Sequence, residues 1–87
     1  MKTFEELWKE LSSKALSSEP GSRSVELLSA GIHEIGKKIV EEAAEVWMAA
    51  EYESKEATAL EISQLLYHLQ LIALAKGVDL QDIYKEL

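Results

Sequence analysis

Three glutamates close together, and a fourth on a later segment, are the residues of this sequence best suited to chemistry. Glu41, Glu42 and Glu45 fall within about one helical turn, and Glu61 and Gln64 follow on a later segment, three residues apart. Like charges three and four residues apart repel each other on a helix, so a bound cation would stabilise them. Carboxylate and amide oxygens are the ligands that hard cations such as Mg²⁺ prefer. The pattern therefore indicates metal-assisted phosphate chemistry.

The available ligand types narrow the choice of metal. The chain has no cysteine, which excludes thiolate sites. A di-iron helical bundle needs a Glu three residues before a His on two helices, whereas Leu65 precedes His68 and Ala30 precedes His33 at that spacing. Oxygen ligands alone favour Mg²⁺ or Mn²⁺ over iron or zinc. With Mg²⁺ we expect a polyphosphate substrate, because the metal would bridge phosphoryl oxygens and lower the pKa of a bound water.

Two helices must bring these residues together. At about 100° per residue, the polar stripe of the first helix contains Lys38, Glu41, Glu42 and Glu45, and the adjoining apolar stripe contains Ile35, Ile39, Ala43, Val46 and Ala50. On the second helix, Glu61, Gln64 and His68 share one stripe, where His68 is expected to be packed and hydrogen-bonded rather than catalytic. Antiparallel packing through a short connection would join the two polar stripes. Carboxylates in that place are costly unless they are paired or bind a metal.

The hydrophobic periodicity predicts four helical segments and no strand, so the fold class is all-α, a small helical bundle. The segments run from 3 to about 17, from 24 to about 53, from 54 to 76 and from 80 to 87. Their expected N-caps are Thr3, Ser24, Ser54 and Asp79. Gly31 and Gly36 interrupt the second segment, and a bend or a close approach by another group is expected there. The turn-rich stretch 17–24 is either an inert connection or a loop that contacts a ligand.

Size and charge limit the class of protein. A chain of 87 residues is expected to form a single domain, residues 1–87, with a thin core that a homodimer would enlarge. The helix after Ser54 is apolar on most sides, which is typical of a bundle centre or a dimer interface. The net charge of −7 argues against a nucleic-acid partner. No signal peptide and no apolar run long enough to span a membrane is present, so a cytoplasmic location is expected.

Two stretches resemble a known family. Lys38-Ile-Val-Glu41-Glu42-Ala-Ala-Glu45 and Glu61-Ile-Ser-Gln64-Leu-Leu-Tyr67-His68-Leu69 are similar to phosphoribosyl-ATP pyrophosphohydrolase of histidine biosynthesis. That family belongs to the all-α nucleotide pyrophosphohydrolases, with the MazG-like enzymes and the dimeric dUTPases, whose signature is Glu-Glu-x-x-Glu followed by Glu-x-x-Asp. The resemblance covers about residues 22–87. It implies a MazG-like bundle of four to five helices that dimerises.

The resemblance also implies roles for individual residues. Glu42, Glu45, Glu61 and Gln64 would hold Mg²⁺, although Gln64 stands where the family usually has Asp. Glu41 would hold a further metal or orient the attacking water, so that Glu41 and Glu42 form the catalytic pair. Lys38 would contact the phosphates of the substrate. The Ser22-Arg23-Ser24 segment, expected to be a loop, would approach the substrate from the open side.

The implied reaction is Mg²⁺-dependent hydrolysis of the α–β phosphoanhydride of phosphoribosyl-ATP to phosphoribosyl-AMP and pyrophosphate, the second step of histidine biosynthesis. The residues alone predict only a Mg²⁺-dependent polyphosphate hydrolase; the nucleotide comes from the resemblance. One alternative is a house-cleaning MazG-like nucleoside-triphosphate pyrophosphatase on the same scaffold. A second alternative is a non-catalytic dimeric helical adaptor. A phosphoribosyl-AMP cyclohydrolase could be a further partner.

Overall fold

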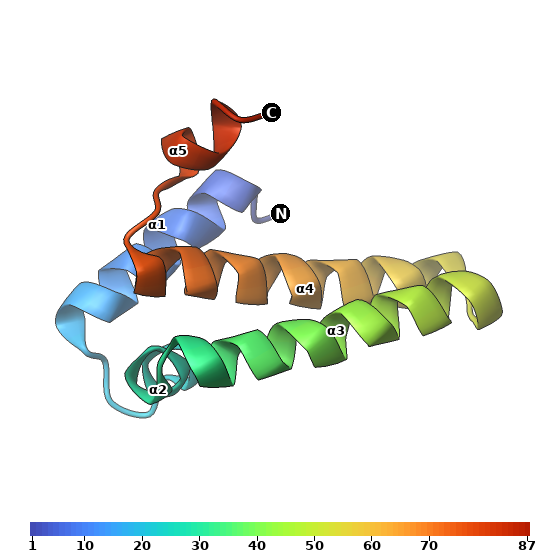
Figure 1. Ribbon diagram of the computed structural model, residues 1–87, viewed down its shortest axis with the longest axis horizontal. Coiled ribbons are helices and arrows are strands. Elements are labelled where there is room, and N and C mark those ends of the chain that lie inside the picture. The colour runs from blue at the N-terminus through green and yellow to red at the C-terminus, as the bar shows by residue number, and fades with distance from the viewer.

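The computed structural model describes residues 1–87 as five α-helices without a strand (Figure 1). The helices are α1 (Phe4–Ser17), α2 (Arg23–Ala30), α3 (Ile32–Tyr52), α4 (Lys55–Lys76) and α5 (Leu80–Tyr84). The predicted all-α fold is therefore confirmed. Five helices appear in place of four segments because the second expected segment is divided into α2 and α3.

The long helices α3 and α4 form an antiparallel hairpin that is the frame of the molecule (Figure 1). Helix α1 crosses the hairpin near its open end, and α2, seen end-on, lies at the start of α3. Helix α5 lies beside α1, and the Tyr84 hydroxyl donates a hydrogen bond to Glu5 Oε1 over 2.9 Å. The half of the hairpin near the α3–α4 turn extends beyond the other helices. Its outer faces therefore have no covering element.

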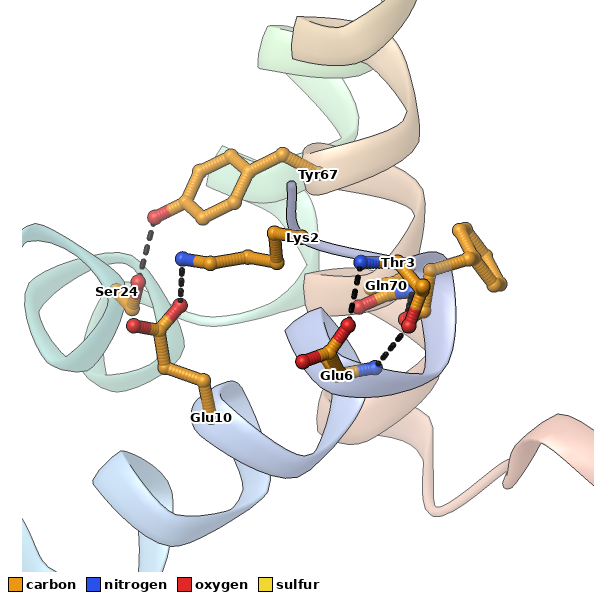
Figure 2. Close-up of polar contacts among 8 residues, drawn as sticks. Lys2, Thr3, Glu6, Glu10, Ser24, Tyr67 and Gln70 are labelled. Atoms are coloured by element: carbon orange, nitrogen blue, oxygen red, sulfur yellow. Dashed lines mark hydrogen bonds and ion pairs between the residues drawn. The ribbon is translucent and has the colours of Figure 1, made fainter.

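Most helix ends follow from local side-chain chemistry. Thr3 and Glu6 form the predicted capping box of α1, in which each side chain bonds the backbone N–H of the other residue (Figure 2). Ser54 caps α4 through its hydroxyl, and Asp79 caps α5 through its carboxylate. Gly77 ends α4 in the left-handed conformation, at φ 80°, which costs glycine little. These boundaries were predicted correctly because their causes lie within a few residues.

The second expected segment needed two corrections. Its N-cap is Ser22 and not Ser24, because the Ser22 hydroxyl accepts the Val25 N–H over 3.3 Å. Gly31 has φ 99° and ψ 174°, a conformation open essentially to glycine alone, and it ends α2 before α3 begins. Gly36 lies inside α3 and interrupts nothing. Only the first glycine therefore acts as the expected break.

The hydrophobic core contains one fully buried side chain from each of the four longer helices: Leu11, Leu27, Ile35 and Leu71. It lies at the open end of the hairpin, where α1 and α2 pack on α3 and α4. The Gln70 side chain is also buried there, and its Nε2 donates to the Phe4 carbonyl oxygen over 2.9 Å (Figure 2). This bond fixes the start of α1 against α4. The open end is thus the rigid part of the fold.

Beyond this core, large apolar side chains remain exposed along the hairpin. On α4, the side chains of Ile62, Leu66 and Leu69 are 43%, 40% and 41% exposed. Their spacing places them on one stripe of α4. On α3, Val40 and Trp47 are exposed as well. None of the helices is both long and apolar enough to cross a membrane.

Candidate functional site

The hairpin brings three carboxylates together in its middle. Oxygens of Glu42 and Glu45 on α3 and of Glu61 on α4 all lie within 4.8 Å of one another. The antiparallel path of α4 back along α3, set by the short turn at Glu53 and Ser54, puts these distant residues opposite each other. The predicted meeting of the two acidic stripes is therefore present in the structure. We call these three residues the carboxylate cluster.

The cluster lies in the interface between α3 and α4, and not merely beside it. The half-buried or buried positions of α3 include a series at alternating spacings of four and three: Ile35, Ile39, Glu42, Val46 and Ala49. On α4 the same spacing gives Glu61, Leu65, His68, Ile72 and Ala75. Such a repeat averages 3.5 residues and is typical of two helices that wrap around each other. Glu42 and Glu61 thus occupy positions that would normally be apolar.

This register corrects one detail of the sequence interpretation. The apolar stripe was expected to include Ala43 and Ala50, with the acids at its border. In the structure Ala43 and Ala50 are exposed, and Ala49 is fully buried. A straight helix of 3.6 residues per turn drifts away from a 3.5-residue repeat, so projection at 100° per residue misplaces positions a few turns away. The true interface includes Glu42.

Burial and mutual repulsion disfavour ionisation of the cluster. The pKa of the Glu42 carboxyl is raised by burial first, and then by Glu45, although His68 and Lys38 act in the opposite direction. The pKa of the Glu61 carboxyl is raised because its protonated form can share a hydrogen bond with Glu45, and further by burial and the charges of Glu45 and Glu42. At neutral pH the three negative charges therefore destabilise the fold unless a cation neutralises them.

A divalent cation fits this donor set. Glu42 Oε2 is buried and has no hydrogen-bond partner in the protein. An unpartnered buried acceptor is costly, and a metal ion would supply the missing partner. The cluster offers only carboxylate oxygens, the ligand type of Mg²⁺. Glu42, Glu45 and Glu61 are therefore the residues that could hold it.

The other predicted site residues of α3 and α4 flank the cluster. Gln64 lies one turn after Glu61 on α4 and is exposed, so its amide oxygen is free to act as a ligand. Glu41 is exposed and lies outside the cluster, with its carboxylate 3.3 Å from Lys38 Nζ. Lys38 is half-buried. This ion pair occupies the same stretch of α3 as Glu42, one turn or less away.

Two aromatic side chains, Tyr67 and His68, follow the cluster residue Glu61 along α4 toward the core. His68 is buried, and its Nδ1 lies 2.7 Å from the Gln64 carbonyl oxygen, so Nδ1 carries the proton and donates it. The expectation of a packed, hydrogen-bonded histidine is confirmed. Tyr67 stands edge-on to His68, with ring centroids 5.0 Å apart. The Tyr67 hydroxyl lies 2.6 Å from Ser24 Oγ on α2, a contact that no local sequence pattern predicts (Figure 2).

The segment Ser22–Ser24 was expected to be a loop, and this was wrong. Ser22 is the N-cap of α2, and Arg23 and Ser24 form its first turn. Ser24 is only 4% exposed, with its hydroxyl engaged by Tyr67. Arg23 is exposed, and its one ion pair, to Glu26 over 3.4 Å, joins two side chains that are both more than half exposed. Of the three side chains, only that of Arg23 extends freely into solvent.

The raised pKa values predict an unusual dependence of stability on pH. A Glu side chain has an unperturbed pKa of about 4.3, and the pKa of Glu42 is higher than this in the folded state. Its contribution to the free energy of unfolding is therefore fully present below pH ~4 and is lost as pH rises through the folded pKa. Glu6 and Glu10, whose pKa values are lowered, act in the opposite direction.

Comparison with Glu42→Gln measures this effect together with the relief of Glu61, whose pKa the charge of Glu42 also raises. In EDTA, the melting temperature of the wild type relative to Glu42→Gln is expected to fall between pH 4 and pH 7. Addition of Mg²⁺ is expected to raise the wild-type melting temperature at pH 7 and not at pH 4, where the raised pKa values of Glu42 and Glu61 favour the protonated carboxyls. A series of thermal melts measures both. A difference that stays constant with pH would contradict the proposed repulsion.

A family model and three known relatives that match this chain all point to one family. A family model described as phosphoribosyl-ATP pyrophosphohydrolase matches residues 3–87. The phosphoribosyl-ATP pyrophosphatases of Streptomyces avermitilis and Streptomyces coelicolor are each 61% identical to this chain over 87 residues, which cover 99% of the chain and 97% of each relative. The phosphoribosyl-ATP pyrophosphatase of Bifidobacterium animalis subsp. lactis is 59% identical, with 100% of both chains covered.

Proposed function

The chain belongs to the phosphoribosyl-ATP pyrophosphohydrolase family, and we propose on this basis that it converts phosphoribosyl-ATP to phosphoribosyl-AMP and pyrophosphate. It is a hydrolase of a phosphoric anhydride and acts in histidine biosynthesis. The carboxylate cluster is the observation that carries the chemistry: it places three oxygen ligands within 4.8 Å of one another in a fold of this family. The bond that breaks is the α–β phosphoanhydride.

We propose Mg²⁺ as the cofactor, held by Glu42, Glu45 and Glu61, with the Gln64 amide oxygen as a further ligand. When bound, the ion supplies Lewis-acid stabilisation of the charge that develops on the phosphoryl oxygens. The protein's own contribution is to hold the ligands in place beforehand. Glu42 and Glu61 lie in the helix interface and cannot move far, so no reorganisation is needed when the substrate binds.

The Glu41 and Lys38 pair supports the hydrolytic step. A phosphate group can take the place of the Glu41 carboxylate as the partner of Lys38 Nζ, since their present contact of 3.3 Å is a weak, solvent-exposed one. Glu41 is then free to orient a water for in-line attack on phosphorus and to accept its proton. The pyrophosphate group departs from the opposite side. This role of Glu41 makes it, with Glu42, the proposed catalytic pair.

The first turn of α2 is the proposed second contact with the substrate. Arg23 is exposed there and has only a weak partner in Glu26, and a guanidinium group binds phosphate in a two-pronged manner. The Ser22 hydroxyl accepts a bond from Val25 and can still donate its own proton to a phosphate oxygen. The buried Ser24 hydroxyl contributes by holding this turn in place.

Pyrophosphate release by the purified chain tests the proposal. We expect Mg²⁺-dependent release from phosphoribosyl-ATP, with a kcat/KM at least about a hundredfold above that for ATP, dUTP or an oxidised nucleotide, because the additional ribose phosphate supplies binding energy that plain triphosphates lack. EDTA is expected to abolish release. A preference for a plain nucleoside triphosphate would instead identify the chain as a house-cleaning pyrophosphatase. No turnover of any nucleotide, with no stabilisation by Mg²⁺, would favour a non-catalytic adaptor.

We also propose that the protein is a homodimer, joined through the exposed α4 stripe of Ile62, Leu66 and Leu69. Only 10 of 87 residues are buried in the single chain, which leaves a thin core for a domain of this size. A second copy would cover apolar surface that water otherwise contacts. Because the stripe and Glu61 are on the same helix, α4, dimerisation would also fix the position of Glu61.

A further inference from the structure

One hydrogen bond between side chains joins α2 to another helix, and it lies in the first turn of α2. Ser24 Oγ and Tyr67 OH are 2.6 Å apart, although the residues are 43 positions apart in the chain (Figure 2). Ser24 is buried and Tyr67 is half-buried. No other side-chain hydrogen bond of α2 reaches beyond the helix itself. The start of α2 therefore depends on Tyr67 for its directional contact with α4.

Helix α2 needs such a contact because little else orients its first turn. It has eight residues, too few for a helix to be stable by itself in water. Both of its connections turn at glycines with positive φ, Gly21 and Gly31, which give it no rigid support. Leu27 anchors the helix in the core, but apolar packing has no preferred direction. The hydrogen bond between the Ser24 and Tyr67 hydroxyls is the contact that fixes both the orientation of the first turn of α2 and its distance from α4.

The bond also connects the first turn of α2, which carries Arg23, to the helix that carries Glu61. Tyr67 follows Glu61 by six residues on α4, a rise of about 9 Å along the helix axis. Arg23 immediately precedes Ser24 in the first turn of α2 and is exposed. A nucleotide whose phosphoanhydride lies at the cluster extends at least this far with its sugar and outer phosphate. The hydrogen bond between Tyr67 and Ser24 therefore anchors the turn that carries Arg23 to the same helix as Glu61.

We infer that Tyr67 is a positioning residue for substrate binding, whose hydroxyl holds the first turn of α2 so that Arg23 meets an outer phosphate of the substrate. The inference rests on the proposed function, since it assigns a task within the same site. Tyr67 does not contact the reacting atoms. Its effect passes through Ser24 to Arg23 and leaves the metal ligands unaffected.

The variant Tyr67→Phe tests this, because the ring that packs against the core remains and only the hydroxyl is lost. We expect KM for phosphoribosyl-ATP to rise about fivefold to twentyfold while kcat changes less than about twofold, the pattern of lost binding that is equal in ground and transition states. Tyr84→Phe is the matched control: it removes a hydroxyl bonded to Glu5 on the surface. Its KM is expected to equal that of the wild type.

A second measurement does not need turnover. Amide hydrogen exchange is expected to become faster in the first turn of α2 in Tyr67→Phe and in Ser24→Ala, with no further increase when both are combined, because either change removes the same bond. Mn²⁺ binding, followed by electron paramagnetic resonance, is expected to be unchanged in Tyr67→Phe. A weakened Mn²⁺ affinity would show that the residue acts on the metal site, which contradicts the inference.

The background Arg23→Gln separates positioning from a general loss of structure. In this background Tyr67→Phe is expected to raise KM by less than about twofold, since the main side chain that it positions is already gone and only the Ser22 hydroxyl remains. A rise in KM as large as in the wild-type background would overturn the inference. So would faster exchange of α2 with an unchanged KM, and that result would leave the proposed hydrolysis intact. Failure of the wild type to hydrolyse phosphoribosyl-ATP would instead overturn the proposed function itself.

Discussion

Glu45→Gln is expected to lower kcat for phosphoribosyl-ATP by about a thousandfold or more, equivalent to roughly 4 kcal/mol of transition-state stabilisation. Glu45 interacts with both other members of the cluster, since it raises the pKa of Glu42 and the pKa of Glu61. The amide keeps the shape of the side chain and one oxygen, but it removes one of three negative charges that would hold Mg²⁺. The effect is large because a weakened Mg²⁺ site would no longer stabilise the negative charge that develops on the phosphoryl oxygens.

The same variant should separate a catalytic role from a structural one. Without metal, its free energy of unfolding is expected to equal or exceed that of the wild type, because a repulsive charge has been removed. The stabilisation by Mg²⁺ in a thermal melt is expected to disappear. Glu34→Gln is the control, an exposed Glu of the same helix whose only ion pair is with Lys37 on the surface. Wild-type turnover in Glu45→Gln would exclude the cluster as the active site.

Leu66→Glu is expected to prevent the proposed dimer from forming. Leu66 lies in the middle of the exposed α4 stripe, between Ile62 and Leu69. In a twofold-symmetric interface the substitution places two carboxylates against apolar partners, and each unpaired buried charge costs several kcal/mol. The dissociation constant is therefore expected to rise by at least about a thousandfold. Sedimentation equilibrium at micromolar concentration measures the change.

The control for this substitution is Leu16→Glu. Leu16 lies at the end of α1 and is 90% exposed, away from the α4 stripe, so the added charge stays in water. This variant is expected to remain a dimer. The melting temperature of Leu66→Glu is expected to fall as well, since the isolated chain buries few residues. A wild-type chain that sediments as a monomer would refute the proposed interface.

Sequence reasoning succeeded where the cause lies within a few residues. The capping box of Thr3 and Glu6, the cap at Ser54 and the glycine that ends α4 were all predicted and all occur. The meeting of Glu42, Glu45 and Glu61 followed from helical periodicity and one short turn, both of which are local features. The family resemblance is confirmed by the comparisons, which support the hydrolysis of phosphoribosyl-ATP in histidine biosynthesis.

The sequence-based predictions failed in two places. One is the start of α2, where either of two serines could be the N-cap, and the other is the α3–α4 interface, where the packing of the two helices sets which residues are buried. Ser22 and Ser24 are equally good caps by type, and the choice fell to Ser22 because Ser24 is buried against Tyr67. The helix interface passes through Ala49 and not through the adjoining Ala50, because paired helices follow a 3.5-residue repeat. In each case the deciding contact is with a residue far away in the chain.

The sequence by itself determined the helices, the acidic cluster and the reaction class, because side-chain type and spacing act along the chain. Only the tertiary structure decided that Glu42 lies in the helix interface with an unpartnered oxygen, and that the first turn of α2 is bonded to α4. Burial and contacts across 43 positions depend on how helices pack, and no local pattern encodes that packing. The raised pKa values of Glu42 and Glu61 follow from the same packing.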